Sequence, residues 1–559
     1  MAMRTFGSTN GLSRFSPFRS AALAALFVGA VACGTTTTVI DRSQPGAPGG
    51  DGTTTDTEPT DPTTVGDPTD KEAPSPPLAN GLAITEVAVF QAVKVPVVTD
   101  GKATSSASRS APVVVNRPAL IRVYVSPASS YKRSEVTAEL RLVDGTTRLP
   151  IVKDTKTLDS DSTDEDIDST FNFEVPGTSL PEGVTYQVLL TAKGGTVPEG
   201  SAANTARFPK DGGVQDLGAK ASGKLKIVIV PVKYDFDGSG RTPDVSAAQL
   251  ERYKNTFMAQ YAASDVEVTA RAPWSYTAAI KGNGAGFSEV LNAITNLRKT
   301  DKASSDVYYY GALAPTSSFN SFCAGGCVTG LSTVVESAKT SFLRASVGVG
   351  FPGQDSVNTA AHEVGHAHGR EHAPCGGAQG VDPDFPHAGG FIGVWGYNLF
   401  TKKFISPTKG HDFMSYCENE WVSDYTFSAL FDRIAAVNGG VTTTTGSATG
   451  SGSGQAQAFA SPQTFRMATV AADGSVSWGG DFDLDEEPAG GQARTATFAS
   501  ASGVEMGTHT ARFYPYDHLP GGVLMVPPAP KTSMLITKAR IVPTWSSVRI
   551  SGLTNALAR

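Results

Sequence analysis

The chain has little charge and no long hydrophobic run for its length. Of its 559 residues, 18% are charged, and the formal net charge is −7. Nucleic-acid-binding domains are typically strongly basic, so this composition gives no indication of nucleic-acid binding. No apolar run reaches the roughly 18 residues that a membrane-spanning helix needs. With 59 Gly and 35 Pro, the composition is not that of a coiled coil or a long helical array, and it favours a multidomain chain rich in loops and β-strands.

Cysteine is also scarce, and the first of the five, Cys33, closes an apolar stretch near the N-terminus. Basic residues precede Ala21–Ala32, which is too short to span a bilayer and is typical of a signal peptide. Small residues followed by Cys33 resemble a bacterial lipobox, in which the Cys becomes the lipidated first residue. We predict that residues 1–33 are a signal peptide with a lipobox, and that the chain is exported. It would then be an outer-membrane or cell-surface lipoprotein that meets the membrane only through this lipid, and the alternative is an ordinary cleaved signal and a secreted protein.

Composition divides the remainder into five parts. Residues 34–80 are rich in Thr, Pro and Asp with almost no large apolar side chains, which predicts a disordered tether. Residues 81–220 contain short alternating runs and predict an Ig-like β-sandwich or a pro-region. Residues 221–440 have a different pattern. Residues 441–456 are a Gly/Ser/Thr linker. The pattern of residues 457–559 predicts a second β-rich, sandwich-like domain.

Strand and helix patterns alternate in residues 221–440, which is typical of an α/β arrangement. Asp235 and Asp237 in this segment are similar to the start of a calcium loop, but the later ligand positions are missing, so a Ca²⁺ site is unsupported and a plain turn is favoured. The predicted elements are strands at 225–232, 266–269 and 307–310, and helices at 245–261 and 288–299.

Six of the eight histidines fall between positions 362 and 411, and four of them belong to one motif. His362 and His366 are four apart, so on a helix both imidazoles point to one side and suit Zn²⁺. Glu363 can lie beside the metal and accept a proton from water without being a ligand. Gly369 allows the helix to stop and the chain to turn, so that His372 can return as a third ligand. Three histidines with one open position predict a catalytic rather than a structural zinc site.

His368 also lies in the motif, but its spacing from His366 points it to another face, which favours a structural or supporting role. The motif His-Glu-x-x-His-x-x-Gly-x-x-His resembles that of the metzincin zinc peptidases. These enzymes place a Met in a tight turn beneath the zinc, and Met414 is the candidate here. Tyr416 matches the spacing of a Tyr that ligates zinc or stabilises the oxyanion in some branches of this clan; a buried core tyrosine is the alternative. The branch within the clan is unassigned.

The resemblance implies a catalytic domain with a twisted mixed sheet, a zinc helix, a Met-turn and a C-terminal helix, flanked by two β-sandwich-like domains: an α+β multidomain protein. Ser346–Phe351 is the candidate edge strand for pairing with an extended substrate. Phe427–Val437 resembles the C-terminal helix of the family. The specificity pocket would come mainly from Pro374–Pro407, where Trp395 and Tyr397 either line the pocket or pack in a core.

The four cysteines after Cys33 all lie in the proposed catalytic domain, and export to an oxidising compartment predicts two disulfides. Three pairings exist; we favour Cys323–Cys327 with Cys375–Cys417, and a Cys-rich zinc site is the alternative. Some metzincins are kept latent by a propeptide cysteine on the zinc. No Cys lies between positions 34 and 322, so latency here would need an Asp, a folded N-terminal domain or no pro-region.

We therefore predict a secreted or surface-anchored zinc endopeptidase that acts on a protein or glycoprotein. His362, His366 and His372 would hold one Zn²⁺, Glu363 would accept the proton of the attacking water, and zinc, with Tyr416, would stabilise the oxyanion. The alternative is a surface adhesin or a glycan- or protein-binding lipoprotein with an inactive metzincin domain.

Overall fold

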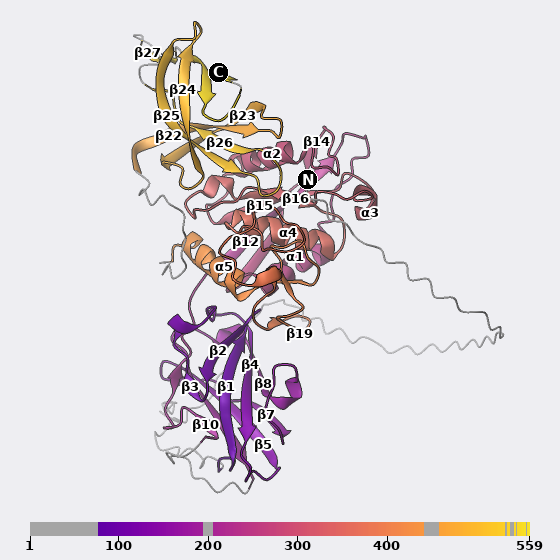
Figure 1. Cartoon of the computed structure of the whole chain (residues 1–559), viewed down its shortest axis with the longest axis vertical. Coiled ribbons are helices and arrows are strands. Elements are labelled where there is room, and N and C mark those ends of the chain that lie inside the picture. Colours follow the sequence, from indigo (N-terminus) through magenta and orange to yellow (C-terminus); the bar gives the residue numbers. More distant parts are fainter. Residues whose placement is uncertain are drawn as a thin grey trace, which may run out of the picture. The chain divides into compact units, whose positions relative to one another are not determined.

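The computed structural model describes residues 77–193, 205–440 and 458–559 of the chain, except for 531–533, 537–540, 544 and 555 (Figure 1). The predicted signal peptide, Cys33, nearly all of the tether and the predicted linker lie outside the described residues. What is described is a mixed α+β structure with several sheets and few helices. Among these residues, no helix combines the length and apolarity needed to cross a membrane.

Residues 77–193 and 205–220 form two antiparallel sheets around a shared apolar core. The alternation seen in the sequence is the reason: Val136, Ala138, Leu140 and Leu142 are buried, whereas most residues between them are not. One sheet has the order β3-β2-β1-β4-β8, with strands Lys102–Ala103, Lys94–Thr99, Leu82–Phe90, Ala119–Pro127 and Phe171–Val175. The other contains β5 (Glu135–Asp144), β6 (Thr147–Arg148), β7 (Val152–Thr157), β9 (Thr185–Ala192), β10 (Arg207–Phe208) and β11 (Gln215–Asp216).

Residues 224–440 contain a mixed sheet of order β13-β12-β15-β17-β16, with β14 paired to β12. The strands β12, β13, β14, β15 and β17 pair in parallel, whereas β16 is antiparallel to β17 and forms the edge. The prediction that Ser346–Phe351 is the edge strand is therefore wrong, because a further strand follows β15 in the chain and pairs outside β17. The bounds are β12 Lys224–Tyr234, β13 Asp265–Ala270, β14 Trp274–Tyr276, β15 Val307–Leu313, β16 Gly330–Ser332 and β17 Ala345–Val349.

Helix α4 (Gln354–Ala367) packs against β16 and β17, and most of its residues are buried. Helix α5 (Asp424–Val437) begins where the Ser423 hydroxyl accepts a hydrogen bond from the Thr426 N–H at 3.0 Å. The other helices are α1 (Ala247–Gln260), α2 (Phe287–Thr300) and α3 (Phe319–Phe322), with short 3-10 turns at 106–108, 167–169, 177–179, 341–343 and 388–390. Two short strand pairs complete this region: β18 (Gly396–Asn398) with β19 (Lys403–Ile405), and β20 (His411–Asp412) with β21 (Glu420–Trp421).

The C-terminal residues form one seven-stranded antiparallel sheet where we expected a second sandwich. Alternating runs identify strands but do not tell whether they pair in one sheet or two. This sheet shares an apolar core with the mixed sheet: Phe342 contacts the rings of Phe482 and Tyr514 at 5.9 and 6.2 Å between centroids. The order is β23-β22-β26-β25-β24-β29-β30, with strands Val476–Glu486, Ala458–Val470, Gly522–Val526, Glu505–Pro515, Gln492–Ser500, Trp545–Ile550 and Leu557–Ala558. β27 (Met534–Ile536) pairs separately with β28 (Ile541–Pro543).

The fully buried Arg117 joins the N-terminal sheets to the helical layer. Its guanidinium donates hydrogen bonds to the carbonyls of Tyr261 at 2.8 Å and Ala263 at 2.9 Å, just after α1, and to Gln91 at 2.8 Å. Burial lowers the pKa of Arg117 to about 9, which still leaves it charged at neutral pH. The charge is therefore stabilised by carbonyl dipoles at the end of α1.

We expect Arg117→Met to lower the free energy of unfolding by roughly 2–4 kcal/mol, because buried carbonyls lose their donors. Urea denaturation followed by tryptophan fluorescence measures this change. Arg133→Met is the matched control, since that side chain is 66% exposed. Equal stability of the two variants would contradict a joining role for Arg117.

Candidate metal centre

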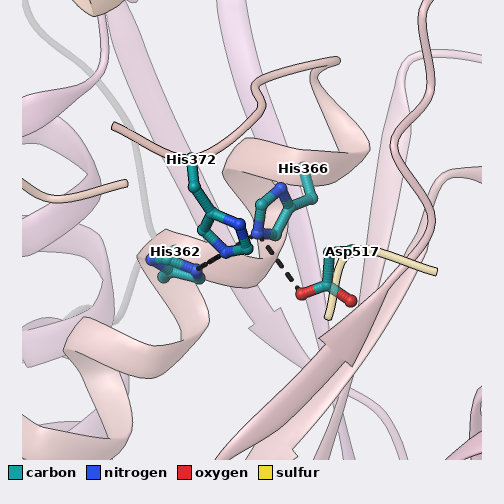
Figure 2. A group of neighbouring side chains, drawn as sticks. All are labelled: His362, His366, His372 and Asp517. Atoms are coloured by element: carbon teal, nitrogen blue, oxygen red, sulfur yellow. Dashed lines mark hydrogen bonds and ion pairs between the residues drawn. The ribbon is translucent and has the colours of Figure 1, made fainter. Parts of the chain in front are cut away.

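Helix α4 and the turn after it bring three histidines together. His362 and His366 lie one turn apart on the same side of α4, and both are buried. The helix ends at Ala367, and Gly369 then takes a φ of +82°. A Cβ at this position would also lie 2.6 Å from the Arg433 guanidinium, so both backbone and space require glycine. The turn returns the chain so that His372 faces the helix (Figure 2).

The three Nε2 atoms converge on one point. The distance is 3.1 Å between His366 and His362, and 3.3 Å between His362 and His372. Nitrogen ligands at 2.0–2.1 Å from a tetrahedral ion lie about 3.3 Å apart, so the spacing fits such an ion. Each Nδ1 faces a backbone carbonyl and donates its N–H there, which leaves Nε2 with a lone pair. The acceptors are Phe413 for His362 at 2.8 Å, Arg370 for His366 at 2.6 Å, and Gln379 for His372.

Burial keeps the His366 ring uncharged, which is the form that binds metal. The pKa of His366 is lowered to about 3, chiefly because burial penalises the charged imidazolium. Imidazole nitrogens at this spacing fit a divalent cation, and the donor set is compatible with a metal such as zinc. The three nitrogen atoms therefore form a site that could hold a metal ion.

His368 lies outside this cluster. Its ring stacks on Tyr308 with 4.1 Å between centroids, and its Nδ1 lies 2.8 Å from the Val364 carbonyl. Burial lowers the pKa of His368 to about 3, so it too is neutral. Its place on another face of the helix follows from its spacing of two from His366, and it supports α4 against the sheet.

Glu363 is buried between α4 and the edge strand β16. A Cβ at Gly330 of β16 would lie 2.4 Å from the Glu363 Oε1, so this carboxylate depends on a glycine beneath it. The backbone carbonyl of Glu363 accepts a hydrogen bond from the Ser346 hydroxyl at 3.0 Å. Together with His362 and Tyr416, the Glu363 side chain lines a cavity of about 30 Å³. A volume of this size holds one or two water molecules.

Met414 packs directly beneath the helix. A Cβ at Gly365 would lie 2.5 Å from the Met414 sulfur, so Gly365, the fourth residue of the motif, is required by this contact. The sequence analysis missed the residue that shapes the turn, Asp412. Its carboxylate accepts hydrogen bonds from the backbone N–H groups of Met414 and Ser423, both at 2.9 Å, although burial raises its pKa. The sequence signal that could have identified this residue is an Asp two positions before the Met.

Tyr416 lies beside the histidines, with ring centroids 4.9 Å from His372 and 5.9 Å from His362. The disulfide Cys375–Cys417 ties the turn after α4 to the Met414 turn, and the second disulfide is Cys323–Cys327. The favoured pairing is therefore the one in the structure. Because all four cysteines of the described residues are oxidised, none offers a thiolate to the alternative Cys-rich zinc site.

One acidic group and one basic group from the C-terminal sheet also reach this centre, and the sequence analysis missed both. The Asp517 Oδ2 lies 3.3 Å from the His366 Nε2, and the His518 Nδ1 is close to the same oxygen. Burial would raise the pKa of Asp517, but the adjacent His518 ring outweighs this effect and holds that pKa below its usual range. Nothing in the Asp-His dipeptide of the sequence signals proximity to a motif so far upstream.

Trp395 and Tyr397 pack away from the metal centre. Tyr397 is buried against Phe90 and Phe404, with centroid distances of 6.2 and 4.8 Å, and Trp395 borders the same cluster. Both residues therefore join the central region to the N-terminal sheets, which is the packing alternative of the two considered.

Part of the chain matches a known family model. Residues 337–449 match the model of Peptidase M66, and this segment contains α4, His372 and Met414. The match supports a metallopeptidase, and therefore a hydrolase. No curated protein matches the chain. One similar solved structure is described as a chaperone-substrate complex, at 11% identity and a TM-score of 0.21. The match covers 48% of this chain and 38% of that one.

We expect Gly365→Ala to destabilise the protein by about 1–3 kcal/mol, because the added methyl group forces Met414 out of place. Helix propensity alone predicts the opposite sign, since Ala favours helices over Gly. Thermal unfolding of Gly365→Ala, Met414→Ala and the double variant measures the coupling. Additive losses in the double variant would show that the two residues are not in contact.

Proposed function

We propose that this protein is a zinc-dependent endopeptidase with a metzincin-like catalytic region. The observation that carries the proposal is the convergence of the His362, His366 and His372 Nε2 atoms, with the Glu363 carboxylate beside them. The Peptidase M66 match supports peptide hydrolysis as the reaction class. The Met414 turn below the helix and the mixed sheet with an antiparallel edge strand support the resemblance to metzincins.

The residues of the centre have distinct roles in this mechanism. His362, His366 and His372 would hold a zinc ion, which would supply Lewis acidity to the attacking water and the scissile carbonyl. Glu363, held between α4 and β16, accepts the proton of the attacking water and delivers it to the leaving amine. Tyr416, whose ring centroid lies 4.9 Å from that of His372, would stabilise the negative charge that develops on the carbonyl oxygen. The edge strand β16 offers backbone groups to an extended peptide.

We also propose that the enzyme works outside the cell. An exported chain is consistent with two disulfides in the described residues. Lipidation at Cys33 and a tether of residues 34–80 would hold the enzyme at an outer membrane or cell surface. The substrate would then be an extracellular protein or glycoprotein.

Glu363→Gln is expected to keep one zinc per chain and to lower the rate of peptide hydrolysis by about 10²–10⁴-fold, because the amide cannot accept a proton. Metal analysis of the full chain and cleavage of an unfolded protein measure the two effects. Removing the metal with a chelator should abolish cleavage, and adding zinc should restore it.

Glu371→Gln is the matched control, since Glu371 is an exposed carboxylate eight residues away on the turn after α4. This variant should bind zinc and cleave as the native chain does. A chain that binds no zinc, or a Glu363→Gln variant that cleaves at the native rate, would overturn the proposed function.

A further inference from the structure

The loop between β25 and β26, residues 516–521, pairs with the edge strand of the mixed sheet. The Asp517 N–H donates to the Ser332 carbonyl at 3.1 Å, and the Ser332 N–H donates to the Asp517 Oδ1 at 3.2 Å. Thr333 and Tyr516 form an antiparallel bridge at the next position. The outer side of β16 is therefore occupied by the chain's own C-terminal sheet. An extended substrate would use the same row of backbone groups.

The Asp517 carboxylate completes the set of metal-binding atoms. One ligand atom from each of His362, His366, His372 and Asp517 lies within 4.8 Å of all the others (Figure 2). The 3.3 Å between the Asp517 Oδ2 and the His366 Nε2 is the separation of two ligands on a tetrahedral ion. Both side chains have no exposed surface. Carboxylate oxygen is a common zinc ligand, and four protein ligands make a closed site.

The space left beside Glu363 is too small for a peptide. The cavity measures about 30 Å³, and His518 of the loop forms part of its wall. Sites for small molecules usually have volumes of about 300–1,000 Å³. The loop therefore occupies both the backbone edge and the space where a scissile bond would lie.

The loop is held there by the sheet that carries it. Tyr514, three residues before Asp517, packs on Phe342, and the Thr340 hydroxyl donates to the Ala489 carbonyl at 2.8 Å. The Lys339 ammonium lies 3.0 Å from the Glu486 carboxylate. Because these contacts fix the sheet against the catalytic region, the carboxylate is presented at a high effective concentration.

We propose that the β25–β26 loop is a built-in inhibitor, in which Asp517 is the fourth ligand of the metal and residues 516–518 occupy the substrate's place. This inference rests on the proposed function, since it assigns a regulation to that site. With the loop docked the chain is inactive, and the cleavage that the native chain shows comes from the molecules in which the loop has withdrawn. The residue that blocks the metal is an aspartate and not a cysteine.

The test uses the full chain loaded with Co²⁺, whose visible absorption reports the ligands of the metal. Acetohydroxamate, a small bidentate metal-binding anion, should leave the native spectrum unchanged, because no coordination position is open. It should shift the spectrum of Asp517→Ala, where one ligand is missing. In the zinc form, Asp517→Ala should cleave an unfolded protein at least about fivefold faster than the native chain, which is the lower range for coupling between sites.

Asp517→Asn is a second variant of the same size whose amide oxygen can still accept from Ser332, and it should respond in the same direction. Asp473→Asn is the matched control, because Asp473 is an exposed aspartate in another hairpin turn of the same sheet. It should behave as the native chain does. A native spectrum that acetohydroxamate shifts as much as those of both Asp517 variants would overturn the inference, and so would equal, non-zero cleavage rates of the native chain and Asp517→Ala.

The two proposals fail in different ways. If the native chain binds no metal, the proposed function is wrong. If the Asp517→Ala metal is open to acetohydroxamate but Asp517→Ala cleaves nothing, the fourth-ligand assignment stands and the peptidase assignment fails. Cleavage by Asp517→Ala that is lost in the Glu363→Gln, Asp517→Ala double variant would support both.

Discussion

The centre depends on three hydrogen bonds from imidazole Nδ1 atoms to backbone carbonyls. These bonds fix the tautomer and the direction of His362, His366 and His372, so that their Nε2 atoms meet. Each carbonyl belongs to a segment that must be held in place. The Phe413 carbonyl belongs to the turn that Asp412 organises, and the other two belong to the segment that follows α4. The turn that Asp412 organises, the glycines and the Cys375–Cys417 disulfide therefore hold the three imidazole rings in their orientations.

Glycine has a specific role wherever another group must approach the helix or the edge strand closely. At Gly365 the close neighbour is the Met414 sulfur, and at Gly330 it is the Glu363 carboxylate. Both positions would accept a larger residue if only local conformation mattered. The constraint is the distance between layers, which is set by the need to bring the three histidines and the Glu363 carboxylate together.

Local sequence patterns predict much of this arrangement. The rest depends on pairing between residues that are far apart in the chain. The predicted helix at 245–261 corresponds to α1, and the zinc helix to α4, because periodicity and motif spacing are local properties. The edge strand was misassigned because β16 is three residues long and lacks a pattern of its own. The single C-terminal sheet and the role of Asp517 depend on contacts between residues far apart, such as the pair Ser332 and Asp517, 185 positions apart. Hydrophobic alternation does not encode which distant strands meet.

A fourth ligand from the chain links metal binding to latency. By thermodynamic reciprocity, if the docked loop increases the affinity for the metal, the metal increases the stability of the docked loop by the same factor. The native state with Asp517 in place would then hold zinc more tightly than the active state with the loop withdrawn. A substrate that displaces the loop must compete with a carboxylate and with the backbone pairs of β16 at once. Such competition favours long extended substrates over short peptides, because only a long chain can replace both sets of interactions.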